Sequence, residues 1–197
     1  NGAIRCKYDT ENDQPVLDSS NPNGIGLPLF AWAEHNLYHK SANKRRIKEV
    51  MPFLQKYVTW LDENFKQENG LYAVPASVSR MENSPRDDAY YPIDFNACMA
   101  INANYMAALG DILNDKDLSF QYKRMYFSIK TRINSLMWDN DTGFYYDLDK
   151  DGNKLSVKTI AAYWTMLAEI PNADKADNLI DHLNNPDSFG TEHPFPT

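Results

Sequence analysis

The sequence predicts an all-α fold of about six helices, arranged as three helical hairpins with a small β-hairpin insertion. After residue 26, apolar residues recur mostly at every third or fourth position, which is the spacing of one face of an α-helix. Residues 143–156 instead alternate with the two-residue period of a strand. The first residues are polar and rich in Asn, Asp, Pro and Gly. We therefore expect an irregular lead-in over 1–26 and one helical domain over 27–197.

The first two helices are expected between residues 28 and 65. The first should begin near Pro28, because proline suits the first turn of a helix. A second helical region runs from about 43 to 65. We expect it to be interrupted or to restart at Pro52, since proline lacks the backbone N–H that a helix interior uses.

Four more helices are predicted, over about 94–113, 117–136, 157–169 and 172–183. Asp94 lies two residues after Pro92 and is the expected N-cap of the third helix. Between the second and third helices lies a connection of roughly 28 residues, far longer than the ~2–8 that usually join helices in bundles. The hairpin within 143–156 is expected to turn at Asp151-Gly152.

A weak internal repeat links the two halves of the chain. Trp60 ends one helix and is followed by a Gly-aromatic segment at 69–72, and Trp138 ends another before a similar segment at 142–145. A unit of two helices and one linker, stacked on copies of itself, predicts either a solenoid or a closed toroid.

Composition excludes several classes of protein. The net charge of −7 argues against a nucleic-acid groove or a basic membrane patch. No apolar run is long enough to span a membrane. The N-terminus lacks the pattern of a signal peptide, so the compartment stays open. Cys6 and Cys98 lack the spacing of a zinc site or a disulfide framework.

The sequence predicts neither a metal nor a cofactor. Residues 147–152 imitate the start of a calcium loop, but Lys158 occupies the position that needs a bidentate glutamate. His35 and His39 share a helix face without a third ligand of the metalloprotease type, which favours surface histidines. No Gly-rich phosphate loop follows a strand. Trp32 and Trp164 fit either core packing or a platform for a sugar ring.

The long connection is the candidate site, because functional residues concentrate in loops held by a rigid scaffold. Its end, from Ser77 to Asn96, is dense in acids, amides and arginines suited to a polyhydroxylated ligand. Glycoside hydrolysis needs one carboxylic acid to protonate the leaving oxygen and a second carboxylate to activate water or to attack the sugar. Glu82, flanked by Met81, is the best acid candidate, and the alternative is a solvated carboxylate paired with an arginine.

At these residues the sequence resembles a known family. Met81-Glu82-Asn83-Ser84-Pro85-Arg86 resembles the Gly-Met-Asp-Asn-Ser-Pro-Arg signature of glycoside hydrolase family 63, and more distantly that of trehalases. Residues 93–97 resemble the Val-Asp-Leu-Asn segment that follows in both families. The resemblance implies an inverting, exo-acting α-glycosidase, α-glucosidase-like, on an (α/α)6 toroid that acts on an oligosaccharide or disaccharide.

The resemblance also assigns roles to residues. It implies that Glu82 is the general acid, that Arg86 contacts substrate and that Asn83 and Asp94 shape the pocket. Asp87 is a further substrate-binding candidate and, with Asp88, a fallback for the acid; Glu192 is expected to border the sugar pocket. The chain departs from the family in having Glu for Asp at 82, Arg for Gly at 80 and Val at 78, where Glu is common.

The predicted helix count implies half a toroid. Such a toroid has twelve helices, and in these families the catalytic base lies in the later ones, so the base is expected outside this chain. We therefore expect this chain alone to be inactive and its apolar helix faces to be covered by the missing half or by self-association. The alternatives are a trehalase-like hydrolase and a non-catalytic helical carbohydrate-binding or interaction module.

Overall fold

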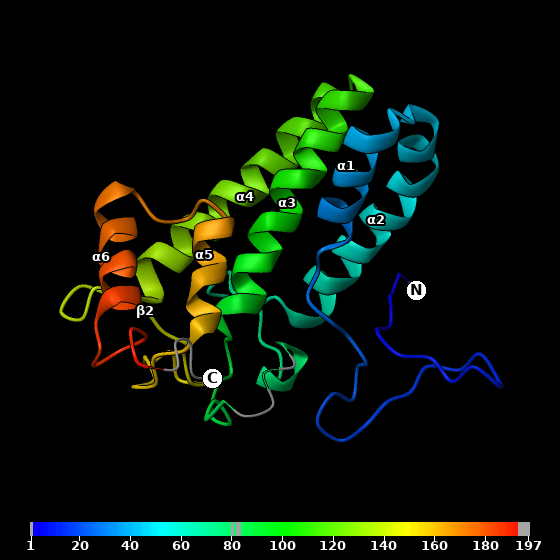
Figure 1. The fold of residues 1–197 in the computed structure, drawn as a ribbon. Helices are drawn as coiled ribbons and strands as arrows, with labels where there is room; N and C mark the ends of the chain where they lie inside the picture. Colours follow the sequence, from blue (N-terminus) through cyan, green and yellow to red (C-terminus); the bar gives the residue numbers. More distant parts are fainter. Residues whose placement is uncertain (1, 80, 82–83, 193–197) are drawn as a thin grey trace.

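The computed structural model describes residues 2–79, 81 and 84–192, and these residues form a mostly helical domain (Figure 1). Two 3-10 helices, η1 (Ala76–Ser79) and η2 (Ile160–Tyr163), lie in the connections. Within the described ranges there are six α-helices: α1 (Phe30–Ser41), α2 (Lys44–Phe65), α3 (Ile93–Leu113), α4 (Lys116–Leu136), α5 (Trp164–Leu167) and α6 (Ala173–Asn184). The expected all-α class and number of helices are confirmed.

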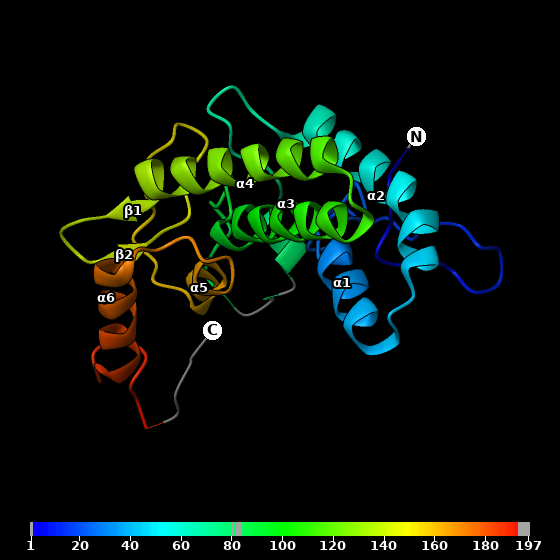
Figure 2. The ribbon, with the colours of Figure 1, turned by 90° about the horizontal axis from the view of Figure 1, so that it is seen from above.

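Helix α3 is the centre of the domain. It is buried over most of its length, and its mainly apolar side chains leave no wide solvent-facing stripe. It contacts α1, α2, α4 and α5, and Figure 2 shows α4 on one side of α3 with α1 and α5 on the other. The prediction that Asp94 caps this helix is wrong, because Pro92 holds the N-cap position. The Asp94 carboxylate is buried inside the first turn instead.

The second helix runs unbroken through Pro52, so the predicted interruption is wrong. Proline removes one backbone hydrogen bond, but a continuous apolar face on either side of it keeps the helix packed. Ile47, Met51 and Leu54 are all buried on that face, whereas the ring of Pro52 is exposed. The Asn43 side chain caps the helix by accepting a hydrogen bond from the Arg46 N–H at 3.1 Å.

Helices α3 and α4 form the closest helical hairpin of the domain. Helix α4 begins where Asp115 accepts a hydrogen bond from the Leu118 N–H, and it buries one stripe that includes Tyr122 and Ile129. Gly110 permits close approach of the two helices, because a Cβ added there would lie 2.9 Å from the Ser119 backbone nitrogen. A larger residue at 110 would therefore force the hairpin apart.

The helix predicted over 157–169 is much shorter than expected. The α-helical part is limited to α5, and a 3-10 turn precedes it. Thr159 caps that turn by accepting a hydrogen bond from the Ala161 N–H, and Glu169 ends the helix with a left-handed φ of 54°. Packing against α3 stabilises this short segment, since α5 and η2 both contact α3.

The β-hairpin lies earlier in the chain than its predicted turn. Strands β1 (Trp138–Asp139) and β2 (Phe144–Tyr145) pair antiparallel, so the strand pairing closes around residues 140–143. The turn expected at Asp151-Gly152 does exist, because the Asp149 N–H bonds the Asn153 carbonyl at 2.9 Å. It joins a single bridge between Leu148 and Lys154 rather than two strands.

Asp139 stabilises the β1–β2 turn through hydrogen bonds that depend on its charge. Hydrogen bonds from the Thr142 N–H at 2.9 Å and from Lys154 at 3.1 Å lower the pKa of Asp139 to about 2. A depressed carboxylate pKa stabilises the fold above the unfolded value of about 4, and this contribution is lost as the pH falls toward the folded value. We expect Asp139→Asn to lower the melting temperature at pH 7.

The two melting temperatures should converge as the pH falls from about 4 toward 2, because protonated Asp139 then resembles asparagine. Thermal unfolding of both proteins by circular dichroism over this pH range tests the assignment. A difference in melting temperature between wild type and variant that stays constant down to pH 2 would show that the charge of Asp139 does not contribute to stability.

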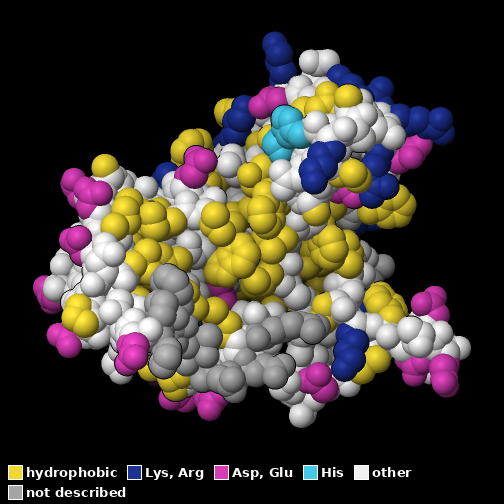
Figure 3. All heavy atoms as spheres, viewed as in Figure 1, with side chains coloured by type: hydrophobic (Ala, Val, Ile, Leu, Met, Phe, Trp, Pro, Cys, Tyr) yellow, Lys and Arg dark blue, Asp and Glu magenta, His cyan; other side chains and the backbone are white. Residues whose placement is uncertain are grey.

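One face of the domain is strongly apolar. In Figure 3 hydrophobic side chains gather over the middle of the molecule, where α1, α3 and α5 lie in Figure 1. Leu167 is 64% exposed at this face, and a narrow crevice there is lined by Trp32, Tyr105 and Trp164. Such a surface is what the partial toroid predicts for helices that lack neighbours.

Within the described residues, no helix combines the length and hydrophobicity that a membrane crossing requires.

Candidate active site

The connection between α2 and α3 lies at the N-terminal end of α3 (Figure 1). Asn96, in the first turns of α3, fixes its early part. The Asn96 side-chain oxygen accepts a hydrogen bond from the Tyr72 N–H at 2.8 Å, and its amide donates to the carbonyls of Tyr72 at 3.1 Å and Pro92 at 2.9 Å. One buried amide therefore holds both ends of the long connection against the helix.

Arg86 fixes the later part of the connection through a buried ion cluster. Its guanidinium pairs with both oxygens of Asp147, at 2.7 and 2.9 Å, and with both oxygens of Asp94, each at 3.0 Å. The three residues are no more than 2% exposed. We call Arg86, Asp94 and Asp147 the arginine clamp.

All five N–H groups of the Arg86 guanidinium have a partner. Four of the N–H groups point to the two carboxylates, and the remaining one lies 3.2 Å from Ser79 Oγ and 3.5 Å from Met81 Sδ. Burial would lower the pKa of Arg86, but hydrogen bonds and charges from Asp147 and Asp94 outweigh it and raise that pKa. Arg86 is therefore a permanent cation whose donors are all engaged within the chain.

Asp147 reaches the clamp because the segment after β2 pairs with the end of the connection. The N–H groups of Tyr90 and Tyr91 both donate to the Leu148 carbonyl, at 2.9 and 3.0 Å. The Leu148 N–H donates in turn to the Tyr91 carbonyl at 3.2 Å. The Asp147 carboxylate also accepts the Ile93 N–H at 2.7 Å, at the start of α3. Anions are favoured at that end of a helix, where N–H groups lack partners.

The structure brings together two of the six predicted site residues, Arg86 and Asp94, in the clamp. Asp87 lies apart from them in an exposed turn, and Glu192 is exposed beyond the end of α6. Glu82 and Asn83 lie outside the described residues, so the expected acid and its neighbour stay predictions. Asp147 was missed as a site residue, because sequence reasoning placed it only in a calcium-like pattern.

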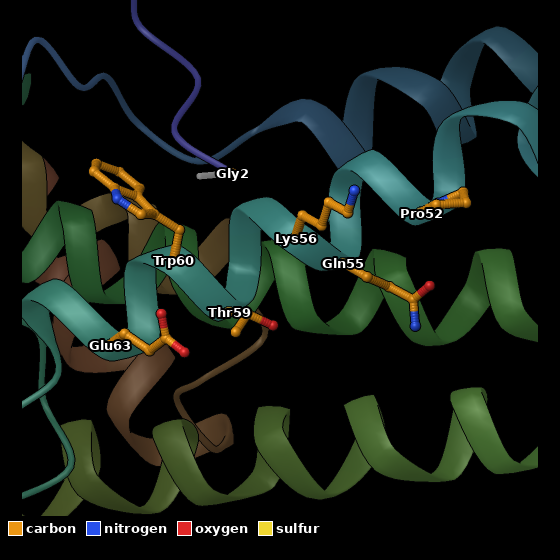
Figure 4. Close-up of a pocket in the computed structure, with 7 residues that line it drawn as sticks. All are labelled: Gly2, Pro52, Gln55, Lys56, Thr59, Trp60 and Glu63. Atoms are coloured by element: carbon orange, nitrogen blue, oxygen red, sulfur yellow. The ribbon is translucent and has the colours of Figure 1, made fainter.

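Two surface hollows differ in their distance along the chain from these segments. One, of 420 Å³, lies between the connection and the 149–155 turn. Its lining includes Asp87, Asp88, Tyr90, Asp149, Lys150 and Asp151. The other, of 580 Å³, lies between Gly2 and the outer side of α2, with Lys56 and Glu63 on its wall (Figure 4). Only the first adjoins the arginine clamp in sequence and carries several carboxylates.

His35 and His39 share one face of α1 as expected, with His39 exposed and His35 partly buried. The Nε2 atoms of His35 and His39 lie 3.2 Å apart, so one ring donates to the other. Burial and the neighbouring His39 lower the pKa of His35. Across the described ranges, no three His, Cys, Asp or Glu side chains are grouped as a metal site would require.

Comparison with known proteins identifies the family. Residues 15–197 match the family described as Mannosylglycerate hydrolase MGH1-like glycoside hydrolase domain. The chain belongs to this family. A protein of Borreliella burgdorferi is 52% identical over 196 residues, which is all of this chain and 41% of the relative. A probable trehalase of Eremothecium gossypii is 21% identical over 182 residues, covering 84% of this chain and 24% of the relative.

Solved structures of glycoside hydrolases have the same fold as this MGH1-like chain. A GH63 mannosylglycerate hydrolase from Thermus thermophilus, in complex with glucose, superposes with a TM-score of 0.80 and 19% identity. The match covers 97% of this chain and 61% of that one. The chain is thus part of an (α/α)6 toroid, and it spans less than half the length of the curated relatives that it matches.

Proposed function

We propose that this chain is the acid-bearing part of an inverting, exo-acting α-glycoside hydrolase that acts on α-glucosides. Membership of the MGH1-like glycoside hydrolase family, together with the Met81-to-Arg86 signature, supports the reaction class. Glu82 protonates the leaving oxygen in this proposal, and a carboxylate outside residues 1–197 activates water from the opposite face of the sugar. The observation that carries the proposal is that the arginine clamp fixes the described residues on both sides of position 82.

Those flanking contacts are specific. Met81 Sδ lies 3.5 Å from Arg86 Nη1, and the Arg86 N–H donates to the Ser84 carbonyl at 2.8 Å. The Ser84 N–H in turn donates to the Met81 carbonyl at 3.1 Å. A general acid has to be held within about half an ångström of its productive position, which requires such support from neighbouring groups.

The charge around the site supports a neutral sugar as the substrate. Four carboxylates and one lysine line the hollow beside the clamp, from Asp87 and Asp88 on one side and 149–151 on the other. A net negative surface of this kind attracts hydroxyl donors and repels an anionic ligand. We therefore place an uncharged α-glucoside ahead of mannosylglycerate, the substrate named for the Thermus relative.

The test is hydrolysis by the full-length protein of a panel of α-glucosides that includes trehalose, with mannosylglycerate as the anionic comparison. On an alkyl α-glucoside of the panel, proton NMR should show β-glucose as the first sugar released, because an inverting enzyme changes the anomeric configuration. First release of α-glucose from that substrate contradicts inversion, whereas inverting hydrolysis of trehalose releases one α- and one β-glucose. Turnover of trehalose alone favours the trehalase-like alternative, and binding without turnover favours a non-catalytic module.

A further inference from the structure

The buried carboxylate of Asp147 joins three parts of the chain that are far apart in sequence. It lies on the segment that follows β2, pairs with Arg86 on the connection and accepts the Ile93 N–H at the start of α3. We propose that Asp147 is a positioning residue for the candidate active site. This inference rests on the proposed function and adds a residue to it: Asp147 acts through Arg86 on the segment that carries position 82.

Arg86 depends on Asp147 for its orientation. The Arg86 Nε donates at 2.7 Å to Asp147, which is its shortest contact, and the fork geometry of two paired oxygens fixes the plane of the guanidinium. Asp94 alone would leave the Nε without an acceptor. With both carboxylates present, the guanidinium plane of Arg86, which contacts Ser79 and Met81, is held in one orientation.

Stability alone is a poor reason to bury such a cluster. Removing three charged groups from water is costly, and apolar residues of similar volume often fill such a site equally well. What the clamp adds is a defined geometry in the connection between α2 and α3. The hydroxyl, thioether and backbone contacts of Arg86 convert that geometry into fixed positions for Ser79, Met81 and Ser84.

The donors of Arg86 are already occupied. All five guanidinium N–H groups are engaged inside the described part of the chain, so the arginine offers none to a sugar in this arrangement. A residue so occupied acts on substrate through the loop that it holds. The same holds for Asp147, whose two oxygens accept from Arg86 and Ile93.

The test compares Asp147→Asn with Asp139→Asn in the full-length protein. Both variants lose one carboxylate of the same hairpin region, but Asp139 pairs with the surface lysine Lys154 and touches no part of the clamp. Each enzyme is assayed on an α-glucoside and on α-glucosyl fluoride, whose leaving group needs little help from an acid. The rate on the α-glucoside divided by the rate on α-glucosyl fluoride does not depend on how much of each variant is folded.

Asp147→Asn should lower this ratio roughly 10- to 100-fold, because a misplacement of about 1 Å costs catalysis that much. KM for the glucoside should change less than kcat, and Asp139→Asn should keep the wild-type ratio. A wild-type ratio in Asp147→Asn overturns the inference while leaving the proposed function intact. A full-length wild type that hydrolyses neither substrate overturns both.

Asp147→Glu covers the case in which Asp147→Asn does not fold. Glutamate keeps the charge that compensates Arg86 but moves the carboxylate by one methylene, so the protein should fold with a displaced clamp. The rate ratio should again fall below that of wild type. A folded Asp147→Glu with the wild-type ratio would show that the site tolerates movement of the clamp, and it would refute the positioning role.

Discussion

Glu82→Gln in the full-length protein should lower kcat on an α-glucoside roughly 100- to 10,000-fold, the usual contribution of a positioned general acid. Glutamine has nearly the shape of glutamate and cannot donate the proton that the leaving oxygen needs. Steady-state kinetics on a glucoside with a poor leaving group measure the loss. KM should change less than kcat, because a group that acts on the transition state contributes little to ground-state binding.

Two comparisons separate lost acid catalysis from lost structure. On α-glucosyl fluoride the same variant should lose far less activity, since fluoride departs without a proton from the enzyme. Glu82→Asp, which restores the residue type of the family signature, should retain much more activity than Glu82→Gln. Equal losses on glucoside and fluoride would contradict the assignment of Glu82.

The neighbouring acids provide the matched controls. Asp87 and Asp88 are exposed in the turn that follows the clamp, and both line the hollow beside it. Asp88→Asn should leave the ratio of glucoside to fluoride rates unchanged if Glu82 is the acid. If Asp87→Asn or Asp88→Asn instead abolishes glucoside hydrolysis alone, the acid lies in that turn, and position 82 has another role.

Helix periodicity carried most of the fold prediction. The apolar stripes of α2 and α4 are local, so the sequence shows them directly, and the capping amides and acids mark where helices begin. The prediction of a break at Pro52 was wrong because buried neighbours on the same helix face outweigh one lost hydrogen bond. The helix at 157–169 was overestimated because packing on α3 imitates helical spacing over a shorter segment.

The site was predictable only as far as its residues lie near one another in sequence. Arg86 and Asp94 are eight positions apart and share the motif, so sequence reasoning placed them together. Asp147 is 61 positions from Arg86, and no local pattern ties it to that arginine. Its alternation with Asp149 and Asp151 resembles the start of a calcium loop, a reading that Lys158 argues against, and gives no sign of a partner at position 86. The pairing of Tyr91 with Leu148 creates the contact, and that pairing is a property of the tertiary fold.

Arg86→Leu should destabilise this chain by about 3–5 kcal/mol, because it leaves two carboxylates buried without their cation. For a domain of this size, each kcal/mol corresponds to a shift of about 2–4 °C, so the melting temperature should fall by roughly 6–20 °C at pH 7. Arg45→Leu is the matched control. Arg45 pairs with Glu49 at 2.8 Å on the surface of α2, and its side chain is 88% exposed.

Such an exposed pair contributes at most about 1 kcal/mol, so the control should melt within about 4 °C of wild type. A drop in Arg86→Leu no larger than in Arg45→Leu would mean that the clamp does not stabilise the fold.

The pH dependence of Arg86→Leu identifies the cause of its loss. Without Arg86, two buried carboxylates lack a compensating cation, and burial penalises the charged form of a carboxyl group. The energetic cost of burying their charges is present at pH 7 and disappears as the pH falls and the carboxylates take up protons.

The gap in melting temperature between Arg86→Leu and wild type should therefore narrow from pH 7 toward pH 4. Lost side-chain packing does not titrate, so a gap that stays constant over this range would assign the destabilisation to packing and not to the uncompensated carboxylates.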